Sequence, residues 1–138
     1  MSRAFCIGLF LAFSVGCATT GERAPLRPLQ EDGPPIPYAE LLTRARQQAQ
    51  TANEAFFVNK WADLEDAARG LEHTARFLGG KKVSDVPPQL KDTLPAISID
   101  LGKEATKLKE AAKANQVNEV NGVLQRVNLK LRELCLDG

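Results

Sequence analysis

The chain contains very few of the residues that most often carry out catalysis or hold a metal. Among its 138 residues there is one histidine, one methionine, one tryptophan and one tyrosine. A site with two histidine ligands cannot form, and a Ser-His-Asp arrangement would depend on His73 alone. His73 is expected on the solvent side of its helix, between Glu72 and Thr74. The composition therefore argues against an enzyme and against a metal site.

An excess of charge of one sign is also missing. The chain has 18 Lys and Arg residues against 17 Asp and Glu residues, a formal net charge of +1. Without a basic excess there is little to neutralise phosphates, which argues against a nucleic-acid partner. Gly79 and Gly80 do not make a phosphate loop, because they follow a predicted helix and do not open one.

The chain has no apolar run of the roughly 20 residues needed to span a bilayer. Its N-terminus carries a shorter apolar run over residues 4–15, which follows the basic residue Arg3 and ends at the small residues Gly16 and Cys17. A positive start, a short apolar stretch and small residues are the parts of a secretory signal. Residues 1–16 are therefore predicted to be a signal peptide.

The sequence Ser14-Val15-Gly16-Cys17 resembles the lipobox of bacterial lipoprotein precursors, departing from it at Ser14, where that family usually has an aliphatic residue. The resemblance implies cleavage before Cys17, lipidation of Cys17 and membrane anchoring on the periplasmic side. Ala18 in place of aspartate implies the outer membrane. The alternative is ordinary cleavage nearby, for example after Ala18, which would leave a soluble periplasmic protein.

Residues 17–37 are predicted to comprise the lipidated cysteine and a disordered spacer. Five of the eight prolines lie between residues 18 and 37, and the segment has no hydrophobic periodicity. A proline-rich segment of this length is semi-rigid and extended, and it could hold a domain up to about 60 Å from the membrane.

Residues 38–138 are predicted to form one all-α domain. Apolar residues recur there at steps of three and four, which is typical of amphipathic helices. The four stripes are Tyr38, Leu42, Ala45, Ala49, Ala52 and Phe56; then Trp61, Leu64, Ala68, Leu71, Ala75 and Leu78; then Leu94, Ile97, Leu101, Ala105, Leu108 and Ala112; then Val117, Val120, Leu124, Val127, Leu131 and Leu134.

Very short turns separate the first stripe from the second and the third from the fourth. Asn59 and Asn115 are predicted to be the N-caps that follow these turns, and they correspond at a shift of 56 residues. Gly79-Gly80 is predicted to end the second helix and Pro95 to lie in the first turn of the third. Short turns make neighbouring helices antiparallel, so two αα-hairpins should form an up-down-up-down antiparallel four-helix bundle.

This pattern resembles the cytochrome c-prime and related c-type four-helix families between residues 41 and 135. The likeness lies in residues 61–71 (WADLEDAARGL), 101–112 (LGKEATKLKEAA) and 120–135. The specific mark of those families is a Cys-x-x-Cys-His motif near the end of the last helix, which binds haem. Here the matching position holds Cys135-Leu136-Asp137-Gly138. The resemblance therefore implies a haem-less relative with no cofactor, and Cys135 as a relic of the haem-attachment position.

Cys135 is predicted to be the only free thiol of the mature protein, because Cys6 leaves with the signal and Cys17 is lipidated. We expect it to be a small, partly buried residue at the end of the last helix. The alternative is an intermolecular disulfide that makes a homodimer.

Two further residues of the predicted bundle, one aromatic and one acidic, are expected to have structural roles. Trp61 is expected to be a core anchor that closes one end of the bundle. Glu104 is expected at the edge of the core, and a single carboxylate does not make a di-iron site.

The function expected from the sequence is that of a non-enzymatic, membrane-anchored periplasmic binding or accessory module with an unknown protein partner. One alternative is a haem-binding electron-transfer or sensor protein of the cytochrome c-prime type. A second is a periplasmic metal or stress sensor.

Overall fold

A computed structural model describes residues 26–135 of the chain. The predicted signal peptide and the predicted lipidation site at Cys17 lie outside the described residues. Four helices dominate the fold: α1 (Tyr38–Phe57), α2 (Trp61–Leu78), α3 (Leu94–Lys113) and α4 (Val117–Leu134). The predicted all-α four-helix bundle is confirmed.

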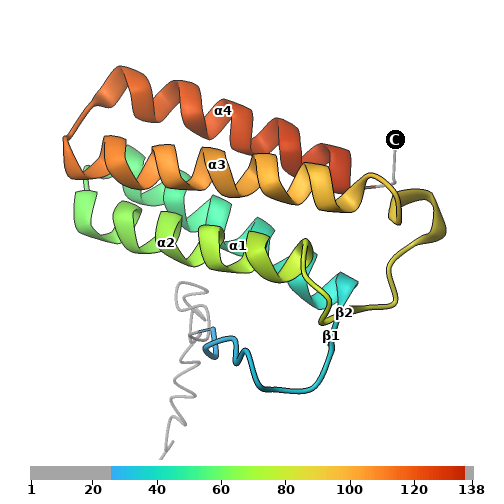
Figure 1. Cartoon of the computed structure of the whole chain (residues 1–138). Coiled ribbons are helices and arrows are strands. Elements are labelled where there is room, and N and C mark those ends of the chain that lie inside the picture. Colours follow the sequence, from blue (N-terminus) through green and yellow to red (C-terminus); the bar gives the residue numbers. More distant parts are fainter. Residues whose placement is uncertain (1–25, 136–138) are drawn as a thin grey trace, which may run out of the picture.

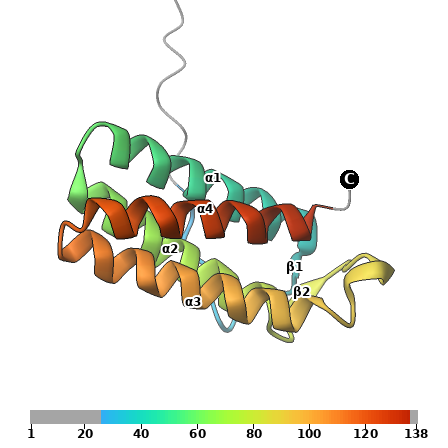
Figure 2. The same ribbon diagram turned by 90° about the horizontal axis from the view of Figure 1, so that it is seen from above.

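The helices run up-down-up-down and form a closed ring of neighbours. The main contacts are between α1 and α2, α2 and α3, α3 and α4, and α1 and α4. Figures 1 and 2 show the four antiparallel rods, with the two short interhelical turns at one end and the longer α2–α3 connection at the other. That connection contains a 3-10 turn (Pro88–Leu90), and Pro95 lies in the first turn of α3 as predicted. Helices α1 and α3 therefore lie at diagonal corners, as do α2 and α4.

Leucine, valine and alanine side chains on the inward faces make the core. The largest fully buried side chains are Leu41, Leu64, Leu71, Leu78, Leu101, Leu108, Leu134, Val120, Val123, Val127 and Thr74. The buried face of α1 is rotated slightly from the predicted stripe, since Leu41 and Ala55 are buried while Leu42 and Phe56 are half-buried. A helix buries a stripe more than one residue wide, so adjacent positions share the core.

The predicted N-caps at Asn59 and Asn115 are wrong. Both residues have left-handed backbones, with φ of 58° and 51°, and each directly follows the C-cap of the preceding helix. Asn59 N–H donates to the Phe56 carbonyl and Lys60 N–H to the Ala55 carbonyl, and the turn at Asn115 repeats both bonds. This is the Schellman pattern, in which asparagine tolerates the left-handed residue after the helix. The correspondence at 56 residues is therefore real, although the residues act as C-terminal caps.

The first residue of each following helix is also less buried than the stripes predict. Val117 is exposed, and Trp61 is half-buried with its ring edge-on to Phe56 at 6.1 Å between centroids. Both residues follow a turn at the end of the bundle, where no further helical turn of a neighbour covers them.

The second half of the predicted spacer lies against the bundle. Ile36–Pro37 (β1) pairs in parallel with Val83–Ser84 (β2), and Ile36 N–H donates to the Lys82 carbonyl at 2.8 Å. Lys82 Nζ donates in turn to the Gly33 carbonyl, and Leu29 packs on the core. Proline prevents a longer strand here, but isolated apolar residues and free backbone groups still hold this segment to the bundle.

Candidate functional site

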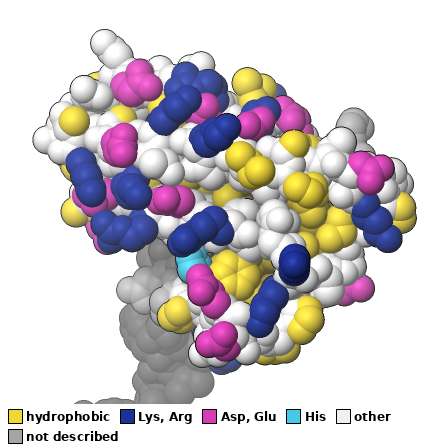
Figure 3. All heavy atoms as spheres, in the orientation of Figure 1, with side chains coloured by type: hydrophobic (Ala, Val, Ile, Leu, Met, Phe, Trp, Pro, Cys, Tyr) yellow, Lys and Arg dark blue, Asp and Glu magenta, His cyan; other side chains and the backbone are white. Residues whose placement is uncertain are grey.

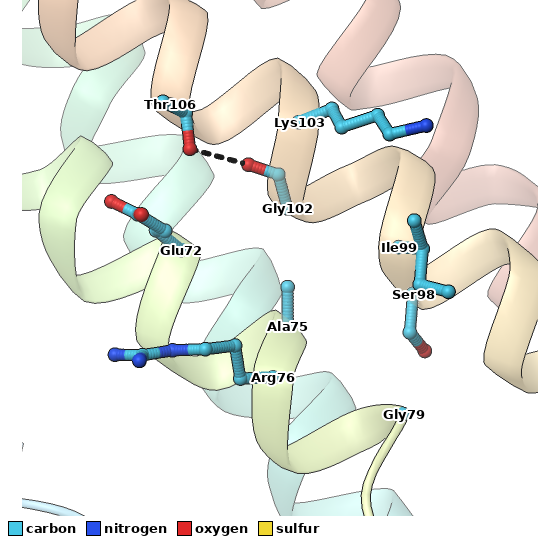
Figure 4. Close-up of a pocket in the computed structure, with 9 residues that line it drawn as sticks. All are labelled: Glu72, Ala75, Arg76, Gly79, Ser98, Ile99, Gly102, Lys103 and Thr106. Carbon is cyan, nitrogen blue, oxygen red and sulfur yellow. Dashed lines mark hydrogen bonds between the residues drawn. The ribbon is translucent and has the colours of Figure 1, made fainter.

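A groove between α2 and α3 is the best candidate for a binding site within residues 26–135. Small residues on both helices create it, because no large side chain fills the space between the two backbones. A Cβ added to Gly79 would lie 3.0 Å from the Ser98 Cβ, and one added to Gly102 would lie 3.7 Å from the Ala75 Cβ. The resulting hollow has a volume of about 370 Å³ and is partly open to solvent; Figure 4 shows the residues that line it. Its lining is Glu72, Ala75, Arg76, Gly79, Ser98, Ile99, Gly102, Lys103 and Thr106.

Ser98 is the unusual member of this lining. Its side chain is only 2% exposed, and its hydroxyl has no hydrogen-bond partner among the described residues. A serine inside a helix commonly donates to the carbonyl four residues earlier, as Thr106 in the same groove does to Gly102 at 3.0 Å. A buried hydroxyl without a partner costs roughly 1–3 kcal/mol. Ser98 therefore offers an unused donor and acceptor at the end of the groove near Gly79.

The rim of the groove is charged on both sides. Glu72 accepts a hydrogen bond from Lys109 at 2.8 Å, which lowers the pKa of Glu72 against the opposing effect of its partial burial. Arg76 lies 3.0 Å from His73 Nδ1. The ammonium group of Lys103 makes no ion pair or hydrogen bond within the part of the chain that the structure describes. Figure 4 shows Arg76 and Lys103 extending to opposite sides of the groove, so cations border its apolar floor.

Ile99 adds an apolar contact at the mouth of the groove. It is 59% exposed, although most large apolar side chains of the bundle are buried. In the space-filling view, apolar side chains gather over the part of this face toward the α2–α3 connection, with Lys and Arg around them (Figure 3). An apolar centre with a polar rim is the arrangement found in many protein–protein interfaces.

His73 does not belong to the groove. The imidazole is half-buried and not fully on the solvent side as the helix register predicts, because Phe77 lies one turn further along α2 at 5.2 Å between ring centroids. Only a small part of the histidine is visible at the surface (Figure 3). With Arg76 against its Nδ1, the ring is part of a surface contact on α2.

Cys135 lies directly after α4, where the sequence places it, and is half-buried. Its Sγ donates to the Leu131 carbonyl at 3.2 Å, a bond that satisfies one carbonyl of the last helical turn. Because α4 and α2 occupy diagonal corners of the bundle, the structure does not bring Cys135 and His73 into one site.

Glu104 lies at the edge of the core, as predicted, and joins α3 to α4. Its carboxylate accepts from Arg126 Nε at 2.9 Å and from Lys107 Nζ at 3.2 Å. Burial alone would raise the pKa of Glu104, but these two cations outweigh it and hold the pKa below its ordinary value. Glu104 therefore has a structural role, since its ion pair with Arg126 links α3 to α4.

Three buried polar residues were missed by the sequence reasoning: Gln48, Thr74 and Ser98. Thr74 Oγ1 donates to Gln48 Oε1 at 2.8 Å, which makes a polar contact between α1 and α2. The sequence did contain evidence that these residues are buried, because each one lies three or four positions from members of an apolar stripe and therefore on the same helix face. Polar residues at such positions are easily assigned to the solvent side.

Within residues 26–135 there is no group of three or more His, Cys, Asp or Glu residues placed to hold a metal ion. The same part of the chain contains no helix with the length and apolar character that crossing a membrane requires.

Two helical glycines should respond oppositely to alanine. Gly102→Ala is expected to raise the free energy of unfolding by about 0.5–1 kcal/mol, because alanine favours the helix and its Cβ meets Ala75 at an ordinary 3.7 Å. Gly70→Ala should lower it by about 1 kcal/mol, since its Cβ would lie 2.8 Å from the buried Gln48 amide. Urea unfolding of both variants measures the difference; equal shifts would contradict this packing.

A comparison with protein-family models, curated proteins and solved structures finds no match to this chain.

Proposed function

We propose that the protein is a lipid-anchored, non-enzymatic periplasmic module that binds a partner protein through the α2–α3 groove. The groove itself carries the proposal, through the unpartnered hydroxyl of Ser98 and the exposed side chain of Ile99. The lipobox-like sequence ending at Cys17 supports the anchor, and the scarcity of catalytic side chains supports a binding role. The bundle itself is proposed to be a haem-less relative of the cytochrome c-prime fold.

A protein segment suits the groove better than a free small molecule. Pockets for small molecules bury most of their ligand, whereas this groove is partly open to solvent. A partner segment can place an apolar side chain on the Ala75 and Gly102 floor and a polar group against Ser98. Arg76 and Lys103 at the border favour acidic residues on the partner.

Fractionation of cells that express the full chain tests the anchor. We expect the wild-type protein in the outer-membrane fraction with a lipid-modified Cys17, and a Cys17→Ser chain to lose that modification and membrane retention. Cys135→Ser is the matched control, since it changes the other cysteine expected in the mature protein. An unmodified Cys17 would contradict the anchor.

In the same cells, a photo-crosslinking amino acid at position 99 or at position 129 tests the groove. Leu129 is a matched control because its exposed fraction of 54% is similar to the 59% of Ile99, whereas its position on α4 is outside the groove. We expect discrete crosslinked species from position 99, at least about fivefold stronger than from position 129, because burial at a specific interface orders the contact. Adding Gly102→Leu should remove them by filling the floor. Equal crosslinking at both positions would contradict a groove-specific partner.

An absorbance spectrum distinguishes this proposal from the alternative of a haem-binding protein. A Soret band in the absorbance spectrum of the purified full-length protein would contradict the haem-less assignment.

A further inference from the structure

The two short interhelical turns make one end of the bundle unusually apolar. We call this the turn end and define it as residues 55–62 and 111–118. Phe57 is 81% exposed, Val58 61% and Val117 53%. Figures 1 and 2 both show the two turns side by side at the end away from β1 and β2. Three of the six exposed large apolar side chains in the described part of the chain therefore lie on one small surface.

Lysine supplies the charge inside the turn end, and Glu54, Asp63, Glu110 and Glu119 border its two segments. Each of its two segments contains one lysine, Lys60 or Lys113, and no aspartate or glutamate. The nearest acidic partners lie further along α2: Asp63 is 4.0 Å from Lys60, and Glu65 is 3.8 Å from Lys113. Both lysines are more than half exposed, so these pairs hold them weakly.

Aromatic rings complete the surface. Half-buried Phe56 contacts both Phe57 and Trp61, at 6.2 Å and 6.1 Å between ring centroids. Exposed Phe and Val, a tryptophan at the border between core and solvent, and lysines with long apolar stems are the residues that favour a bilayer interface. Lysine also attracts anionic phospholipids at a membrane surface.

The reach of the chain makes contact with the anchoring membrane feasible. The carbonyl of Arg27, near the start of the described residues, accepts from Arg44 at 2.6 Å, which fixes it beside the early part of α1. Arg44 and Phe57 are separated along α1 by about 20 Å at 1.5 Å per residue. The chain between Cys17 and Leu26 can span at most about 30 Å. A lipid on Cys17 and the turn end can therefore meet the same bilayer surface.

From these observations we infer that the turn end inserts into the phospholipid interface of the membrane that holds the lipid anchor. This inference rests on the proposed anchor and adds a second, protein-borne membrane contact. It fixes the orientation of the bundle, with the turn end at the lipid surface and the opposite end of the helices away from it. A second copy is a poorer occupant, because stable dimers usually need about 20–30 residues a side and the turn end offers two short segments.

Trp61 is the only tryptophan of the chain and reports on this surface directly. Full-length lipidated protein is reconstituted into vesicles of phosphatidylethanolamine and phosphatidylglycerol, with and without bromine-labelled acyl chains. Bromine should quench the Trp61 emission by at least about twofold. The triple variant Phe57→Ser, Val58→Ser and Val117→Ser should show no bromine-dependent quenching. Its fold is checked by circular dichroism, since all three side chains are exposed.

The control variant Leu129→Ser removes an exposed apolar side chain from α4, outside both the turn end and the α2–α3 groove, and should keep full quenching. Absence of quenching in wild-type protein with a lipid-modified Cys17 would overturn the inference and leave the anchor standing. If Cys17 proves unmodified, the anchor fails by itself, and the same quenching measured after adding the protein to vesicles still decides the inference. A crosslink at position 57 to a protein or to a second copy, without quenching, would also overturn it.

Discussion

Replacing Leu71 by alanine is expected to lower the free energy of unfolding by about 3–5 kcal/mol. Leu71 is fully buried near the middle of α2, the helix that packs on both α1 and α3. The substitution loses the transfer free energy of the side chain and leaves a cavity that helices held on two sides cannot close. A domain of this size has a total stability of roughly 5–15 kcal/mol, so the variant should lose a large fraction of it.

Urea unfolding followed by far-ultraviolet circular dichroism measures this loss, and Leu129→Ala supplies the control. Leu129 is chemically identical but exposed on α4, so its truncation should change stability by no more than about 0.5 kcal/mol. A similar small change for Leu71→Ala would mean that α2 does not pack at the centre of the bundle.

Raising the pH through the range from about 10 to 12 should destabilise the protein through Tyr38. The ring is buried, and its hydroxyl donates to the Leu134 carbonyl, which joins the start of α1 to the end of α4. Burial, assisted by the nearby Cys135 and opposed by Arg46, raises the pKa of Tyr38 to about 12. A folded-state pKa above the unfolded value means that the stabilisation is complete below pH 10 and is lost as the pH rises through 12.

The difference between Tyr38 and a Tyr38→Phe variant isolates this effect from the titrating lysines. Phenylalanine should cost about 1–2 kcal/mol at neutral pH, because it leaves the Leu134 carbonyl without its donor. The difference in free energy of unfolding between the two proteins should then disappear as the pH rises from about 10 to 12. Over that range the wild-type protein loses up to about 2–3 kcal/mol of the stability that depends on the neutral tyrosine. Tyr38 is the only tyrosine, so its phenolate absorbance gives the pKa independently. Titration near 10 would contradict the buried hydrogen bond.

The sequence alone predicted the helices because the evidence for them is local. Stripes of apolar residues at steps of three and four, two short turns and Pro95 lead to four antiparallel helices without any knowledge of contacts. The repeat at 56 residues located both turns correctly. It did not give the conformation of Asn59 and Asn115, because asparagine favours both the start of a helix and the left-handed residue after one.

The candidate site was beyond the reach of sequence reasoning because it depends on two separate helices. Two pairs of small residues lie one turn apart in the sequence, which is common in helical proteins: Ala75 on α2 with its C-cap Gly79, and Ser98 with Gly102 on α3. Only the crossing of α2 and α3 brings the two pairs together and leaves the Ser98 hydroxyl buried without a partner. The pairing of β1 with β2 is likewise a contact between distant segments that no local pattern announces.

The sequence by itself therefore determined where the helices lie, in what order they run, and how few catalytic groups the chain has. Tertiary structure decided which polar side chains are buried, how residues 26–37 contact the bundle, and where the surface is hollow or apolar. The physical reason is that helix periodicity is set by each backbone segment alone. Grooves, exposed ends and unpartnered groups depend on the register between segments, and small energetic differences in packing fix that register.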